Sequence, residues 1–139
     1  MLEEVFLQLT KVGTLVETIL NDCLGLPPNF LKEYNHDRSW DFMVALRYFP
    51  ATDDENNGIS EHEDGNCVTF VFQDEVGGLE VCKNQEWIPV IPTQGAIVVN
   101  VGDVLQVSIY FSHSYIQRER QYLTSKPSRT FFFKILLVF

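Results

Sequence analysis

The sequence predicts a mainly β domain of the jelly-roll type, a sandwich or barrel of short strands, with a helix at the N-terminal end. Two patterns support this fold class: helical periodicity over the first 24 residues, and short β-rich runs separated by turns between residues 40 and 107. A chain of 139 residues with 45% hydrophobic side chains is large enough for one domain with its own core. We therefore expect a helical segment at residues 1–35 and a β domain at residues 36–139.

An amphipathic helix is predicted over residues 2–24, where apolar side chains recur at intervals of three and four. Gly25, Pro27 and Pro28 supply end signals, and residues 28–34 predict one further short helix. A stripe at this spacing usually faces a core, and a partner-binding helix is the alternative interpretation. The stripe consists of Leu2, Val5, Phe6, Leu9, Val12, Val16, Ile19, Leu20 and Cys23.

The β domain is predicted from runs of β-branched and aromatic residues that turn-forming residues interrupt. An acidic loop at residues 51–58 follows the first run and invites a calcium interpretation. It lacks the regular alternation and the terminal glutamate of an EF-hand loop, which favours a solvated loop. The predicted strands are residues 40–50, 67–72, 79–82, 87–91, 96–101 and 104–107, with turns at 77–78, 83–86 and 102–103.

Composition excludes several classes of partner. A formal net charge of −9 would repel a phosphate backbone, so we expect no nucleic-acid partner. The three cysteines lack Cys-x-x-Cys spacing and are predicted to be small core residues in a reducing compartment. No basic leader precedes an apolar segment, and no apolar run is long enough to span a bilayer. The sequence therefore predicts a soluble, cytoplasmic protein that does not engage a membrane.

The candidate chemistry lies in the stretch from Ile59 to Asn66, which holds the only His-x-Asp pair of the chain, His62 and Asp64. In an extended segment, residues two apart project to the same side, so both side chains can reach one metal ion. Two histidines and a carboxylate on one face of Fe(II) form the facial triad of non-haem iron oxygenases. The pair would supply two of these three ligands, and an ordinary solvated loop is the alternative.

The order of motifs along the chain resembles the plant-type Fe(II)- and 2-oxoglutarate-dependent dioxygenases, the isopenicillin N synthase-like group that includes flavonol synthases and hormone oxidases. The resemblance covers roughly residues 1–107. A cupin-like metal protein outside this family is the alternative, against which the Trp-Ile-Pro-Val and Asn-Val-Gly-Asp strings argue. The matching strings are His62-Glu63-Asp64-Gly65, Thr69-Phe70-Val71-Phe72-Gln73-Asp74, Val76-Gly77-Gly78-Leu79-Glu80-Val81, Trp87-Ile88-Pro89-Val90 and Gly95-Ala96-Ile97-Val98-Val99-Asn100-Val101-Gly102-Asp103.

This resemblance implies an incomplete double-stranded β-helix that encloses Fe(II), with 2-oxoglutarate as co-substrate. In such oxidoreductases the iron carries the oxidising chemistry, and a small plant metabolite or hormone is hydroxylated or desaturated. Carried over to this chain, His62 and Asp64 are the first two iron ligands, and Gly65 and Asn66 hold the turn behind them.

The chain departs from the family pattern after Val107, where a divergent tail begins. Alignment of the following strand places Gln117 at the distal ligand position, and a neutral amide oxygen binds Fe(II) more weakly than imidazole. His113 is the alternative third ligand, but it requires a shifted strand register. Arg129 matches the arginine that grips the far carboxylate of 2-oxoglutarate, while Phe131 stands in place of the accompanying serine.

Two further departures keep a second hypothesis open. Phe49 replaces a tyrosine of the family that contacts the co-substrate, and family segments before the helix and after the arginine strand have no counterpart in this sequence. The chain is thus expected to be either a truncated dioxygenase with weak metal binding, or an inactive relative that acts as a binding module or has no function. An uncovered barrel edge leaves self-association open.

Overall fold

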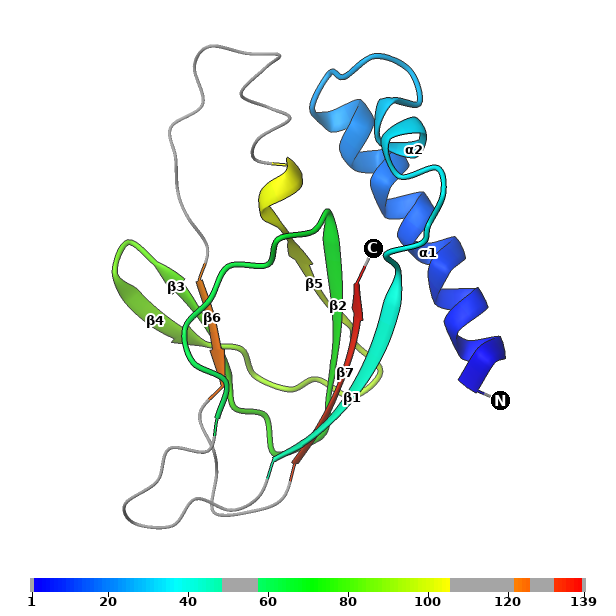
Figure 1. The fold of residues 1–139 in the computed structure, drawn as a ribbon. Coiled ribbons are helices and arrows are strands. Elements are labelled where there is room, and N and C mark those ends of the chain that lie inside the picture. Colours follow the sequence, from blue (N-terminus) through cyan, green and yellow to red (C-terminus); the bar gives the residue numbers. More distant parts are fainter. Residues whose placement is uncertain (1, 49–57, 106–121, 126–131, 139) are drawn as a thin grey trace.

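A helical layer opens the chain and covers one face of a sheet. The computed structural model describes residues 2–48, 58–105, 122–125 and 132–138. Helix α1 spans Leu2–Cys23 and helix α2 spans Phe30–Tyr34, which confirms both predicted helices. Figure 1 shows α1 running alongside the sheet that contains β1 and β2. Neither of these described helices is long and apolar enough to cross a bilayer.

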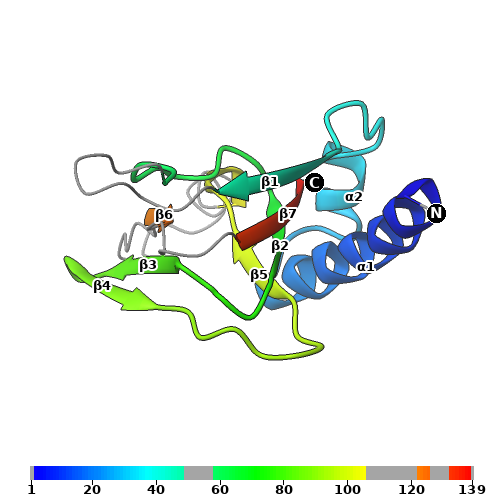
Figure 2. The same ribbon diagram turned by 90° about the horizontal axis from the view of Figure 1, so that it is seen from below.

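The described strands form two antiparallel sheets, as the sequence pattern predicted. One sheet has the order β1-β7-β2-β5, and the other has the order β4-β3-β6. Neighbours in the first sheet are mostly distant in sequence, so the chain passes back and forth between the two sheets, which form separate layers (Figure 2). The strands are β1 (Phe42–Tyr48), β2 (Val68–Gln73), β3 (Leu79–Lys83), β4 (Glu86–Pro89), β5 (Val98–Val101), β6 (Tyr122–Ser125) and β7 (Phe132–Val138).

Strand β2 separates two apolar clusters, because side chains alternate across a strand. Val68 and Phe70 are buried in the larger cluster with Leu26, Leu31 and residues of α1. Val71 belongs to the smaller cluster with Leu79 of the second sheet. Both faces of β2 are therefore covered, one by the helices and one by the other sheet. This strand and the loop before it are anchored on both sides.

The hydrophobic stripe of α1 is rotated from the predicted face. Val5, Val12 and Ile19 were expected in the core but are 43%, 42% and 51% exposed. Glu17 and Asn21 lie inside instead, at 1% and 4% exposure. Their hydrogen-bonding partners account for this orientation, because a buried polar side chain is stable only when it is paired.

Those partners come from the segment between α1 and β1. The Arg38 guanidinium donates to the Glu17 carboxylate and, at 3.2 Å, to the Thr14 hydroxyl, and it forms a second ion pair with Asp41. The Asn35 amide donates to Glu17 at 2.7 Å. We call Glu17, Arg38 and Asp41 the charged triad. It ties helix α1 to the segment that enters β1.

Two other predictions need correction. The predicted strand at 104–107 is wrong for its described part, because residues 103–105 form a helical turn that folds back on the loop before β2. Cys23 was predicted to be a core residue but is exposed at the end of α1, whereas Cys67 and Cys82 are buried as expected. All three thiols are free, which confirms that they form no disulfide framework. The acidic loop at 51–57 and the tail at 106–121 lie outside the described residues.

Candidate metal centre

The predicted ligands His62 and Asp64 lie together in the loop of residues 59–66 that leads into β2, which we call the ligand loop. His62 Nε2 and Asp64 Oδ1 are 3.4 Å apart, which confirms that the two side chains project to the same side. The His62 side chain is 40% exposed and that of Asp64 is 15% exposed. Solvent therefore reaches the imidazole, while the carboxylate is largely enclosed by its neighbours.

A backbone contact sets the orientation of the His62 ring. Nδ1 lies 2.9 Å from the Ser60 carbonyl oxygen. A carbonyl oxygen only accepts hydrogen bonds, so Nδ1 carries the proton in this contact and the Nε2 lone pair of the neutral ring is left for a metal. Hydrogen bonds of this kind commonly fix the tautomer of metal-binding histidines. The imidazole therefore presents its donor atom toward Asp64.

The Asp64 carboxylate is held through its other oxygen. The Asn100 side-chain amide donates to Asp64 Oδ2 at 2.7 Å, which leaves Oδ1 on the side of His62. Two ligand atoms that bind one metal ion at about 2.1 Å and at right angles lie about 3 Å apart. The observed 3.4 Å separation is close to this value, so the pair fits two neighbouring positions on one metal ion.

Nothing in the described part of the chain completes the ligand set. No group of three or more His, Cys, Asp or Glu side chains that could hold a metal ion is present among the described residues. The predicted third ligand Gln117, its alternative His113, and the predicted co-substrate residue Arg129 all lie outside those residues. Their roles remain predictions.

A buried cysteine thiol lies next to the ligand loop. Cys67 follows the ligand loop and is 3% exposed. Burial raises the pKa of Cys67 to about 11, and nearby Glu17 contributes in the same direction. Because the thiolate is the metal-binding form, a neutral buried thiol at this position is chemically inert.

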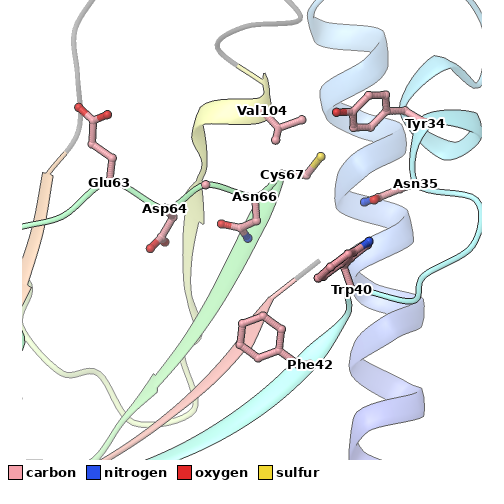
Figure 3. Close-up of a pocket in the computed structure, with 10 residues that line it drawn as sticks. Tyr34, Asn35, Trp40, Phe42, Glu63, Asp64, Asn66, Cys67 and Val104 are labelled. Carbon is pink, nitrogen blue, oxygen red and sulfur yellow. The ribbon is translucent and has the colours of Figure 1, made fainter.

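A pocket of about 460 Å³ borders the ligand loop on the side of helix α2. Figure 3 shows the aromatic rings of Trp40 and Phe42 on one side of it and Asp64 and Asn66 on the other. His62 does not line this pocket. Its further lining residues are Tyr34, Asn35, Glu63, Gly65, Cys67 and Val104.

Sequence reasoning missed the role of Asn100 and Gly102 in this centre. Asn100 was noticed as part of a predicted strand and Gly102 as part of a predicted turn, but their contacts with the ligand loop depend on how β5 pairs with β2. Gly102 approaches the loop so closely that an added Cβ atom would lie 2.1 Å from the Asn66 carbonyl oxygen. The glycine next to a polar residue at the end of a strand was the available signal of this close approach.

Comparison with known proteins identifies the family of this chain. The model of the 2OG-Fe(II) oxygenase superfamily matches residues 40–124, which include both candidate ligands. The chain belongs to this superfamily. Among curated proteins, 1-aminocyclopropane-1-carboxylate oxidase homolog 5 of Arabidopsis thaliana is 38% identical over 102 residues. The matched region is 72% of this chain and 25% of that protein, so the chain spans only about a quarter of its relative's length.

Solved structures of the same superfamily confirm the jelly-roll fold. A 2OG-Fe(II) oxygenase family protein from Caulobacter crescentus superposes with a TM-score of 0.72 at 21% identity, and the match covers 98% of this chain and 45% of that one. The rice dioxygenase for auxin oxidation superposes with a TM-score of 0.65 at 25% identity, and the match covers 88% of this chain and 40% of that one. In both comparisons the chain therefore matches less than half of the solved protein.

Proposed function

We propose that this chain carries part of an Fe(II)- and 2-oxoglutarate-dependent dioxygenase centre, in which His62 and Asp64 bind the iron. The observation that supports this function best is the pairing of His62 Nε2 with Asp64 Oδ1 at 3.4 Å, with each side chain oriented by its own hydrogen bond. When bound, iron and 2-oxoglutarate supply the oxidising chemistry for hydroxylation or desaturation of a small organic substrate.

The residues of this chain would orient the reaction. His62 offers Nε2 because its Nδ1 is engaged by the Ser60 carbonyl, and Asp64 offers Oδ1 because its Oδ2 accepts from Asn100. A single carboxylate and a neutral imidazole leave net positive charge on Fe(II), which favours an anionic co-substrate such as 2-oxoglutarate. The Asp64 side chain is 15% exposed, so its carboxylate is mostly surrounded by protein.

The third iron ligand and the residue that binds 2-oxoglutarate are proposed to lie in the tail after Val107. We propose Gln117 as the distal ligand, with His113 as the alternative, and Arg129 as the partner of the far carboxylate of 2-oxoglutarate. An amide oxygen in place of imidazole weakens Fe(II) binding. Activity is accordingly expected to be lower than in a relative with a complete triad.

Small plant metabolites are the proposed substrate class. Related structures are described as a dioxygenase for auxin oxidation in rice and as JOX2 in complex with 2OG, Fe and JA.

The domain organisation and the location of the protein are also proposals. We propose a helical segment at residues 1–35 and a partial jelly-roll domain at residues 36–139, in a protein of the cytoplasm. The net charge of −9 supports the absence of a nucleic-acid partner.

A second candidate function is an inactive relative that acts as a binding module. The residue that favours it is Gln117, which stands at the distal ligand position in the alignment of the tail. Under this alternative the chain folds but forms no complex with Fe(II) and 2-oxoglutarate.

One experiment separates the two functions. Fe(II) and then 2-oxoglutarate are added to the purified protein without oxygen, and the visible charge-transfer band of the chelated complex is recorded. The dioxygenase proposal predicts a band that Asp64→Ala abolishes and that Glu75→Ala, which removes an exposed carboxylate, preserves. A folded sample without any band would support the inactive module instead.

A further inference from the structure

The ligand loop is held from behind by the segment that ends strand β5. Asn100 faces the interior at 8% exposure, while its neighbours Val99 and Val101 are 45% and 42% exposed. Its amide donates to Asp64 Oδ2 at 2.7 Å. A buried amide that bonds a carboxylate both satisfies its own polar group and restricts rotation of the carboxylate.

Strand register brings these two residues together from distant parts of the chain. Asn100 lies directly opposite Thr69 in the antiparallel β2–β5 pair. The loop that contains Asp64 turns into β2 just before Thr69, so it passes over the end of β5. Thr69 itself is 3% exposed and bonds the Asn66 side chain instead of Asp64.

Three backbone hydrogen bonds fasten the same loop. The amides of Gly102, Asp103 and Val104 donate to the carbonyl oxygens of Cys67 at 3.0 Å, Asp64 at 2.8 Å and Asn66 at 3.3 Å, respectively. This spacing is reached only because Gly102 has no side chain, since a Cβ atom there would also lie 2.8 Å from the Asp64 carbonyl oxygen. The loop therefore has little freedom to shift relative to β5.

We propose that Asn100 and Gly102 are positioning residues that aim the Asp64 carboxylate at the metal. Gly102 allows the ligand loop to lie close to the end of β5. Asn100 donates a hydrogen bond to Asp64 Oδ2, so that Oδ1 faces His62. The inference rests on the proposed function, because it assigns these residues to the iron site. It adds two residues of β5 and the turn after it to a site that the His-x-Asp pair alone did not reveal.

The first test needs no metal. The Asn100 side-chain amide is followed by nitrogen-15 NMR in the parent chain and in the variants Asp64→Ala and Thr69→Val. A large shift of the Asn100 amide signal on Asp64→Ala, and a small one on Thr69→Val, supports the contact. An Asn100 signal that does not respond to Asp64→Ala overturns it.

The second test measures the affinity for Fe(II) alone, without oxygen, by competition with a chromophoric chelator. Asn100→Ala is expected to weaken binding about 10- to 100-fold, the usual effect of losing a hydrogen bond to a metal ligand. Asn100→Asp keeps the size of the side chain but cannot donate from a carboxylate and repels Asp64, so it should weaken binding at least as much. Thr69→Val is the matched control and should change the affinity by less than about threefold.

The outcomes separate this inference from the proposed function. If the parent chain binds Fe(II) and Asn100→Ala binds it equally well in the folded state, the positioning role is wrong. Equal losses in Asn100→Ala and Thr69→Val would also overturn it, because a general loss of packing would then explain both. If the NMR contact is present but the parent chain binds no Fe(II), the proposed function is wrong while Asn100 still orients Asp64.

Discussion

Two segments of this molecule are held against a neighbouring element, one against helix α1 and one against strand β5, by contrasting chemistry. The segment between α1 and β1 is tied by the charged triad, in which Glu17 at 1% exposure pairs with Arg38 and Arg38 also pairs with Asp41. The ligand loop accepts hydrogen bonds from neutral donors, among them the Asn100 amide and the backbone amides of Gly102, Asp103 and Val104.

The two kinds of contact differ because the Asp64 carboxylate must keep its negative charge available to a metal ion, whereas the Glu17 carboxylate has no such requirement. A buried ion pair neutralises its own charges, which suits a structural tie but would consume a metal-binding carboxylate. A neutral amide holds one oxygen of Asp64 and leaves the negative charge available to a cation. The charged triad is therefore expected to govern stability, and the Asn100–Gly102 segment to govern metal affinity.

The largest expected effect is the loss of the charged triad. Glu17→Ala leaves the Arg38 guanidinium without its buried partner and should lower the free energy of unfolding by about 3 kcal/mol. Urea unfolding followed by circular dichroism measures this change. Glu4→Ala, on the exposed face of the same helix, should change it by less than about 0.5 kcal/mol. Equal effects of the two substitutions would refute a special role for the triad.

The next effect distinguishes two glycines of the metal centre. Gly102→Ala forces a Cβ atom against the Asn66 backbone and should cost about 1–3 kcal/mol of stability and weaken Fe(II) binding about tenfold or more. Gly65→Ala, next to Asp64 itself, has no atom within 4 Å of the added carbon and should be nearly neutral in stability. Urea unfolding and chelator competition report the two quantities. The interpretation fails if Gly102→Ala is tolerated as well as Gly65→Ala.

The rate of thiol alkylation should differ between Cys23, which is exposed at the end of α1, and Cys67, which is buried next to the ligand loop. Raising the pKa of Cys67 from 9.0 to about 11 lowers its thiolate fraction at neutral pH about 100-fold, and burial also blocks access. Iodoacetamide at neutral pH should therefore label exposed Cys23 at least about 100-fold faster than Cys67. Peptide mass spectrometry locates the label, and in strong urea the two rates should become similar. Rapid labelling of Cys67 in the folded chain would contradict its placement.

The smallest effect is a pH dependence within the charged triad. Burial raises the pKa of Asp41 above its ordinary value of 3.8, against the opposing influence of Arg38. The folded state then binds more protons than the unfolded state, so this group lowers stability as the pH rises above 3.8. Asp41→Asn removes that term, so its stability relative to the parent should increase as the pH rises above 3.8. Thermal unfolding across this range measures the difference, and a constant or falling difference would argue against the buried carboxyl.

The features that could be predicted from the sequence are those that depend on the spacing of residues close together in the chain. Helix α1 follows from its periodicity, and the common projection of His62 and Asp64 follows from their spacing in an extended segment. The rotation of α1 could not be predicted, because the partners that stabilise buried Glu17 are Asn35 and Arg38, which lie 18 and 21 positions away. Charge alone places a glutamate outside, and only tertiary pairing reverses that preference.

The supporting contacts of the metal centre were hidden for a related reason. Asn100 reaches Asp64 through the pairing of two strands that lie about thirty residues apart, and no periodicity encodes that register. Residues 104 and 105 were predicted to begin a strand at 104–107, in which Val104 and Val107 favour β structure locally. Backbone bonds to the ligand loop and complete burial of Leu105 outweigh that preference.

The position of β7 has a consequence for how the chain is made. Strand β7 lies between β1 and β2 and pairs with both along most of their length. A ribosome delivers β1 and β2 long before β7, so during synthesis β1 has no described neighbour in this sheet and β2 has only β5. Such long-range pairing delays completion of this sheet until β7 emerges. Expression in the cell should consequently depend on chaperones that shield nascent strands from one another.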